Sequence, residues 1–319
     1  MPVIPALKAL LDSMPPAQPL DLTNLPTLRV AGLEGSNALA AMVAGTPPQV
    51  GAVTTAQVPV DGGEIMVRIY QPEGAGPHPM HIFYHGGGWM AGTIDEQFVD
   101  ILCRERTALA GYVTIAVEYR LAPEHKFPVP LEDSYAALLW AAEHAREFDA
   151  DPDLITVGGG SAGANLAAAV TLKARDKNGP HIAFQVLEVP ALDLTLSGPG
   201  YELYGTGEYP LPLAEIEICR TAYLRTSEDQ TNPYVSPLLA EDLSGLPPAH
   251  IISSEYDPLQ FDGSRYADRL NAAGVKATFT LGSGQVHGSS QFTKMLPESA
   301  AWRDEILSAL RSHAGQQTS

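Results

Sequence analysis

One short stretch, residues 158–163 with the sequence Gly-Gly-Gly-Ser-Ala-Gly, limits the folds open to this chain more than any other. The residues just before it, 154–157, form an apolar and β-branched run, which predicts a short buried strand. Residues 162–175 are rich in Ala and Leu and predict a helix. Ser161 is therefore expected on a sharp strand-to-helix turn, in the G-x-S-x-G arrangement of a nucleophile elbow. The plainer alternative is a glycine-rich turn whose serine caps the helix.

Strands and helices alternate along most of the chain. We expect a hairpin formed by residues 57–60 and 65–70 around an Asp-Gly turn. Further strands are expected at 80–84, 112–118, 181–189, 249–254 and 275–281, and helices at 96–110, 131–148, 212–224, 261–273 and from 289 onward. Such alternation is typical of βαβ units, so the sequence predicts an α/β fold with a mostly parallel sheet that is covered on both faces.

Two segments lack this alternation. Residues 1–50 are rich in Pro and Ala, and we expect short helices at 5–11 and 36–43, joined by loops through Pro15, Pro16, Pro19 and Pro26. Residues 191–247 contain several tyrosines and prolines around the helix expected at 212–224. We expect these two segments to cover one end of the sheet.

Composition argues against several classes of partner. The 319 residues include 19 Lys and Arg but 37 Asp and Glu, a formal net charge of −18, and no basic run, which disfavours binding to nucleic acid or an anionic membrane. Cys103 and Cys219 are too few for a disulfide framework and lack metal-ligand spacing, so we expect free thiols in a reducing compartment and no metal. Neither a signal peptide nor a membrane-spanning pattern is recognised, and a cytoplasmic protein is expected.

A glycine run follows one of the expected strands directly. His85-Gly86-Gly87-Gly88-Trp89 comes after the strand at 80–84 and exposes backbone N–H groups that no side chain covers. This is how an oxyanion hole is built in hydrolases with a nucleophile elbow. A flexible turn is the alternative, but the elbow farther along the chain favours the functional interpretation.

A serine nucleophile needs a base and an acid that orients the base, here expected in the chain order Ser, acid, His at the ends of strands. Asp257 and His287 satisfy that order. His287 lies in the glycine-rich segment 282–288, expected to be a loop. Asp262 and Glu255 are rival acids: Asp262 is expected near a helix start, where an acid commonly complements the helix dipole, and Glu255 has the wrong alternation for a strand end. His85 is expected to hold the glycine loop by hydrogen bonds.

The chain resembles the hormone-sensitive-lipase-like branch of the α/β hydrolases. The matching segments are His85-Gly-Gly-Gly-Trp89, Tyr119-Arg-Leu-Ala-Pro-Glu124, Gly159-Gly-Ser-Ala-Gly163, Asp257-Pro-Leu259 and His287-Gly288. Residues 172–176 and 185–193 additionally resemble bacterial carboxylesterases of the heroin esterase type.

The resemblance implies an α/β-hydrolase fold with an eight-stranded, mostly parallel sheet. Residues 51–190 and 248–319 would form the catalytic core, with a helical cap made of an N-terminal segment, 1–50, and an insertion, 191–247. It implies a serine carboxylesterase that needs no cofactor and works through an acyl-enzyme, usually on short acyl chains. Ser161 would be the nucleophile, His287 the base and Asp257 its orienting acid, with the amides of Gly86, Gly87 and Ala162 as the oxyanion hole. It also implies a homodimer formed through the last strand and the C-terminal helix.

Two positions depart from the pattern of that branch. Gly160 stands where a polar residue commonly precedes the serine, and Ala164 stands where Gly is common. Three successive glycines are expected to loosen the elbow or to make room for a substrate or a water molecule. Neither position supplies a triad group, so we expect the chemistry to be retained.

The expected cap offers aromatic and apolar side chains for a substrate pocket. Trp89, Tyr201, Tyr209 and Leu211 are the candidates, with Tyr204 and Leu213 nearby in the sequence. An enclosed pocket of this kind favours small-molecule esters with acyl chains of roughly two to eight carbons. Hydrolysis of lactones, aryl amides or formamides by the same residues remains an alternative, as does a ligand receptor that does not turn over, although a receptor would be expected to have lost a triad residue.

Overall fold

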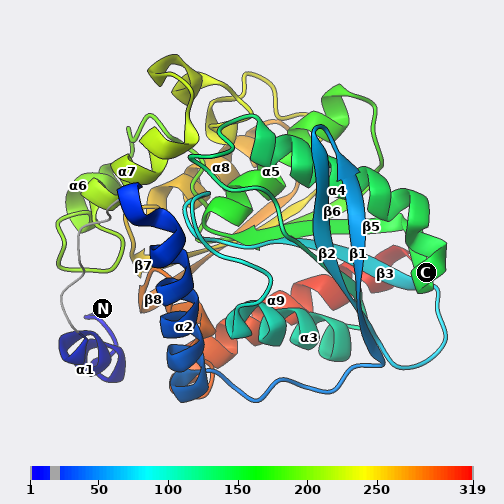
Figure 1. Cartoon of the computed structure of the whole chain (residues 1–319), viewed down its shortest axis with the longest axis horizontal. Helices are drawn as coiled ribbons and strands as arrows, with labels where there is room; N and C mark the ends of the chain where they lie inside the picture. The colour runs from blue at the N-terminus through cyan, green and yellow to red at the C-terminus, as the bar shows by residue number, and fades with distance from the viewer. Residues whose placement is uncertain (1, 15–21, 318–319) are drawn as a thin grey trace.

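The computed structural model describes residues 2–14 and 22–317, in which eight strands form a single sheet with helices on both faces (Figure 1). The strand order is β1-β2-β4-β3-β5-β6-β7-β8. The pairs β1–β2 and β2–β4 are antiparallel, and every neighbouring pair from β4 to β8 is parallel. This confirms the predicted α/β class and the mostly parallel sheet. The strands are β1 (Ala52–Val60), β2 (Gly63–Gln71), β3 (His78–Tyr84), β4 (Val113–Val117), β5 (Ala150–Gly160), β6 (Ile182–Glu188), β7 (Ala249–Tyr256) and β8 (Ala277–Val286).

Helices cover both faces of the sheet because neighbouring strand residues point to opposite sides and both sides are apolar. In β6, Val186 packs in the cluster that contains Trp302 and Ile306 of α9, whereas Leu187 belongs to the cluster under α4, α5 and α8. Figure 1 shows α3 and α9 on one face and α4, α5 and α8 on the other. The helices are α1 (Pro5–Ser13), α2 (Leu25–Val43), α3 (Gln97–Ala110), α4 (Val129–His144), α5 (Ala162–Asp176), α6 (Pro199–Tyr204), α7 (Leu213–Tyr223), α8 (Gln260–Ala272) and α9 (Pro297–Gln317), joined in places by short 3₁₀ turns.

The helix expected at residues 36–43 is longer than predicted. It begins at Leu25 and includes Pro26, which we had expected in a loop. Proline is tolerated in the first turn of a helix because the N–H groups there have no partner within the helix. Pro15, Pro16 and Pro19, the other prolines expected in loops, lie outside the described residues.

The segment 282–288 is not the loop that its glycines suggested, because β8 continues through it to Val286. A Cβ atom on Gly282 would lie 2.5 Å from the indole of Trp302, so only glycine lets α9 pack on the strand here. Gly284 has a φ of +72° and its N–H donates to Glu255. His287 therefore follows the end of a strand directly, as Asp257 does after β7.

Among residues 2–14 and 22–317, no helix has both the length and the apolar composition needed to span a bilayer.

Candidate active site

Ser161 lies on the sharp turn between β5 and α5 that the sequence predicts. Its backbone has φ 56° and ψ −118°, a strained conformation for a residue with a side chain. The glycines on either side of Ser161 are required by packing. A Cβ atom on Gly159 would lie 2.4 Å from the carbonyl carbon of Gly163, and a Cβ atom on Gly163 would lie 2.0 Å from the carbonyl oxygen of Tyr84. β5 and β3 thus approach α5 closely enough to hold the serine hydroxyl at the end of the sheet.

Ser161, His287 and Asp257 form one continuous chain of hydrogen bonds. The Nε2 atom of His287 lies 3.1 Å from Oγ of Ser161, and its Nδ1 atom lies 2.7 Å from Oδ2 of Asp257. Asp257 is fully buried and its other oxygen accepts the N–H of Leu259 at 2.9 Å. An ionised Asp257 can only accept, so Nδ1 carries the proton and Nε2 is free to take one from the serine.

The electrostatic surroundings favour a protonated imidazole once the proton has been taken. Burial by itself lowers the pKa of His287, but the charge and hydrogen bond of Asp257, together with the charge of Glu215, outweigh it and raise the pKa above its usual value of 6.5. A base with a raised pKa accepts a proton more readily at neutral pH.

The rival acids lie elsewhere. Asp262 is fully buried in α8 and accepts the N–H groups of Leu192 and Asp193 and the hydroxyl of Tyr201. Asp262 lies in the first turn of α8, near the helix start as expected, and these hydrogen bonds additionally fix the segment after β6. Burial raises the pKa of Asp262 to about 7. Glu255 lies within β7 and accepts the N–H of Gly284.

The glycine loop after β3 lies against the elbow. A Cβ atom on Gly86 would lie 3.7 Å from Cβ of Ser161, and Gly87 has a φ of +112° that a side chain would strain. His85 holds this loop as expected, since its Nδ1 atom is 2.8 Å from the carbonyl oxygen of Gly86. Tyr119 supports it as well, with its ring stacked on His85 at a centroid distance of 4.2 Å and its hydroxyl donating to the His85 carbonyl.

A cavity of about 720 Å³ opens in front of these residues, at the carboxyl ends of β3, β5, β6 and β8. Of the expected pocket residues, Trp89, Tyr201 and Leu211 line it. Tyr209 does not: its ring packs 5.1 Å from Tyr256 and 6.0 Å from Tyr204, in a cluster over α1 and the end of β8. Tyr201 is only 3% exposed, and its hydroxyl donates to Asp262 and to the Asp193 carbonyl.

The cavity includes residues that the sequence analysis did not select. Arg29 and Leu25 of α2 contribute to its wall, as do Glu215, Ile216 and Cys219 of α7. The buried positions of α7 repeat with helical spacing at Ile216, Cys219 and Tyr223. Glu215 lies one turn before Cys219, so helical periodicity was the available signal that this acid faces inward.

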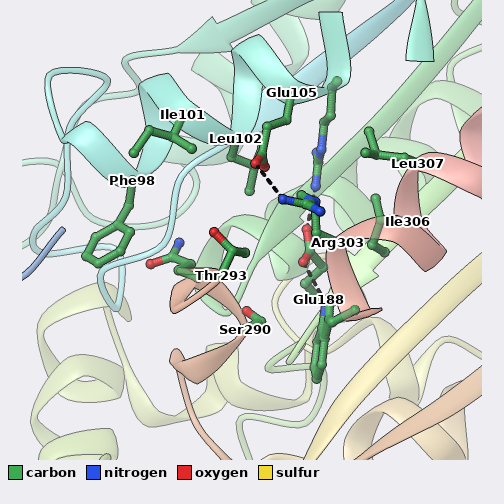
Figure 2. A pocket seen from close by; sticks show the side chains of 13 residues that line it. Phe98, Ile101, Leu102, Glu105, Glu188, Ser290, Thr293, Arg303, Ile306 and Leu307 are labelled. Carbon is green, nitrogen blue, oxygen red and sulfur yellow. Dashed lines mark hydrogen bonds and ion pairs between the residues drawn. The ribbon is translucent and has the colours of Figure 1, made fainter. Parts of the chain in front are cut away.

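A second, much smaller cavity of about 40 Å³ lies between α3 and α9, behind the sheet end that carries Ser161. Figure 2 shows Glu105 of α3 and Arg303 of α9 pointing toward one another across it, 3.4 Å apart. Glu188 lines both cavities; its carboxylate pairs with the buried Arg106 and accepts the indole N–H of Trp302.

No cluster of His, Cys, Asp or Glu suited to a metal ion occurs within residues 2–14 and 22–317. Cys103 and Cys219 are both buried and unpaired with each other, and burial raises the pKa of each thiol to about 12. Both thiols are therefore protonated at neutral pH and unreactive.

The sequence matches a family model described as the alpha/beta hydrolase fold over residues 81–291. The chain is 43% identical to the carboxylic ester hydrolase LipN of Mycobacterium tuberculosis over 267 residues, which cover 82% of this chain and 70% of that protein. It is 37% identical to the carboxylesterase NlhH of the same organism, with 78% of each chain covered.

Solved structures agree with these relatives. The fold superposes on a hyperthermophilic esterase of the archaeon Pyrobaculum calidifontis with a TM-score of 0.91 and 34% identity, covering 98% of this chain and 99% of that one. It also superposes on EstE1, a thermostable carboxylesterase from a metagenomic library, with a TM-score of 0.87 and 36% identity, covering 92% and 99% of the two chains.

Proposed function

Because this chain belongs to the hormone-sensitive-lipase-like branch of the α/β hydrolases and is a carboxylic ester hydrolase, we propose that it hydrolyses short- to medium-chain esters through Ser161, His287 and Asp257. The observation that carries the proposal is the hydrogen-bond chain from Ser161 through His287 to the buried Asp257. A helix-capping serine, the plainer role, would need no imidazole within 3.1 Å.

The reaction begins when Oγ of Ser161 attacks the ester carbonyl carbon while Nε2 of His287 takes the hydroxyl proton. The carbonyl oxygen becomes an oxyanion, which the amides of Gly86, Gly87 and Ala162 stabilise; one such donor typically contributes about 3 kcal/mol to the lowering of the barrier. His287 then gives its proton to the departing alkoxide, which leaves as an alcohol. Water repeats the sequence on the acyl-enzyme, and the acid and the free serine are released.

The lining of the cavity supports a small-molecule ester as the substrate. The cavity has a volume of about 720 Å³ with Trp89 and Leu211 in its wall, and α2 and α7 also contribute to that wall. We infer that residues 1–50 and 191–247 act together as the cap. Each added methylene contributes about 0.8 kcal/mol of burial until the wall is reached, after which overpacking reverses the gain.

A series of p-nitrophenyl esters from acetate to palmitate tests the function. We expect kcat/KM to peak between roughly two and eight acyl carbons and a burst of p-nitrophenol to report the acyl-enzyme. Ser161→Ala should abolish almost all turnover in folded protein. Activity that keeps rising up to palmitate would make this protein a lipase. Preferential cleavage of lactones, formamides or aryl amides would change the substrate class. Absence of any turnover would favour a ligand receptor.

We also propose a homodimer through β8 and α9. β8 is the last strand of the sheet, and among the described residues no strand pairs with its outer edge, a position that invites pairing with a second chain. Light scattering should give twice the monomer mass at micromolar concentration, and a monomer there would refute the dimer.

A further inference from the structure

Glu215 contributes a carboxylate to the wall of the large cavity, in the first turn of α7. The side chain is partly buried, and within residues 2–14 and 22–317 it takes part in no hydrogen bond or ion pair. Glu215 and His287 both line this cavity. Burial raises the pKa of Glu215, and the charge of His287 lowers it. A half-buried carboxylate without a partner is costly unless a cation supplies one.

The other carboxylates in the cavity wall differ from Glu215 because each has partners in the protein. Glu96 accepts a hydrogen bond from Ser36, and Glu118 accepts the N–H of Ile94 and the hydroxyl of Thr93. Glu188 pairs with Arg106 and Trp302. Of the four, Glu215 is the one whose charge is left for a ligand, within the part of the chain that the structure describes.

The cations in the same wall do not neutralise Glu215. Arg29 is committed to Glu124 and to two backbone carbonyls. Arg220 lines the cavity too, but its guanidinium reaches the Leu194 carbonyl at 3.4 Å and forms no ion pair with Glu215. His287 is a cation while it holds the proton of Ser161 and at pH values below its pKa, and it is neutral in the form that accepts that proton. The apolar cavity therefore contains one unneutralised carboxylate near the reacting atoms.

We propose that Glu215 is a cation-binding subsite, so that the enzyme favours esters that carry a quaternary ammonium or protonated amine over neutral esters of the same shape. The inference rests on the proposed ester hydrolysis at Ser161. A fixed cation pairing with a partly desolvated carboxylate gains far more than it would in water, because the effective dielectric constant is lower. The net charge of −18 adds long-range attraction for the same substrates.

Glu215 has a simpler possible role, since an acid in the first turn of a helix stabilises its N-terminus. The experiment must separate that role from substrate recognition. Glu217 offers a matched control: it lies on the same helix, is exposed, and its removal changes the net charge by the same amount without touching the cavity.

Two isosteric pairs of ester substrates test the proposal at pH 8. Each pair is measured with the wild-type protein and with the Glu215→Gln and Glu217→Gln variants. In the first pair, acetylcholine carries the charge on the alcohol and 3,3-dimethylbutyl acetate is its neutral counterpart; both are followed by acid release in a pH-stat. In the second pair, the p-nitrophenyl ester of 4-(trimethylammonio)butanoate carries the charge on the acyl group, and the p-nitrophenyl ester of 5,5-dimethylhexanoate is its neutral counterpart. The readout is the ratio of kcat/KM for the charged and neutral members, which cancels a general loss of stability.

We expect Glu215→Gln to lower this ratio about tenfold in at least one pair and Glu217→Gln to leave it unchanged. If the ratio in Glu215→Gln falls less than threefold in both pairs, the subsite is refuted. The same holds if the variant melts at a lower temperature but keeps the ratio. Calorimetric titration of Ser161→Ala with the same uncleaved esters measures the charge preference independently of turnover. Wild-type protein that cleaves none of the four esters would refute the proposed function, while a charge preference in that titration would still support the subsite.

Discussion

The Nε atom of Arg29 lies 2.7 Å from the carbonyl oxygen of Met90, so helix α2 is bonded directly to the loop that follows β3. The same guanidinium donates to the carbonyl of Ala122 and pairs with Glu124. Ala122 in turn donates its N–H to the carbonyl of Trp89. One side chain thus connects the N-terminal segment, the glycine loop and the segment at 119–124, which explains why these distant pieces lie together beside Ser161.

Removal of that connection should impair both stability and catalysis. We expect Arg29→Ala to lose about 2 kcal/mol of unfolding free energy, a typical value for charge-assisted hydrogen bonds, and to lower kcat/KM because the cavity wall is no longer fixed. Lys8→Ala, which removes an exposed ion pair in α1, is the control and should change little. Denaturant unfolding and ester kinetics measure both effects; kinetics in Arg29→Ala that match Lys8→Ala would contradict this role.

Asp257 and Asp262 are both fully buried, but only Asp257 touches the imidazole. Asp257→Asn should lower kcat on the order of 10³–10⁴, because the amide favours the wrong tautomer and removes the charge that stabilises the imidazolium. Asp262→Asn should change kcat far less. Steady-state kinetics of the two variants decide the matter, and the reverse ranking would mean that the wrong carboxylate has been assigned.

Gly160 and Gly163 are expected to tolerate substitution very differently. A Cβ atom on Gly160 would meet nothing within 4 Å, whereas one on Gly163 would collide with the carbonyl oxygens of Tyr84 and His85. Gly160→Ala should therefore keep a melting temperature close to the wild type, and Gly163→Ala should lose more than ~3 kcal/mol of stability or fail to fold. Equal melting temperatures would show that the elbow is less tightly packed than the structure indicates.

The rate should fall as pH decreases through a value above 6.5, since only neutral His287 can accept the serine proton. Burial lowers this pKa, and Asp257 and Glu215 raise it further than burial lowers it. Glu215→Gln removes a negative charge and should move the acid limb of kcat/KM to lower pH, while Glu217→Gln should leave it in place. A limb that stays fixed in Glu215→Gln would mean that the two groups do not interact in the free enzyme.

The elements that position the chemistry could be predicted because their signals are local. An apolar strand followed by a glycine turn marks the elbow at Ser161, and the predicted strands place Asp257 and His287 at the same end of a parallel sheet. The structure brings these three side chains within hydrogen-bonding distance, in the chain order expected. Their catalytic roles are predictions that the variants above test.

The cavity wall was harder to predict because it depends on contacts between distant segments. Tyr209 looked like a pocket residue from its neighbours in sequence, but stacking on Tyr256 draws it away from the cavity. Arg29 gave no sequence signal, since its partners Met90 and Glu124 come from other parts of the chain. The glycines at 282 and 284 indicated a loop, although Trp302 and Glu255 show that they serve a strand.

His287 follows β8, the edge strand, which has a partner strand on one side only within the described residues. Edge strands open in local fluctuations that cost less than global unfolding. A molecule whose β8 has detached still keeps β5, the Ser161 elbow and the glycine loop on the central strands, yet it has lost its base. Hydrolysis by the monomer therefore reports on the fraying of one peripheral strand, and inactivation of the monomer by heat or denaturant should precede the loss of helical circular dichroism. Pairing of β8 in the proposed dimer should close that gap.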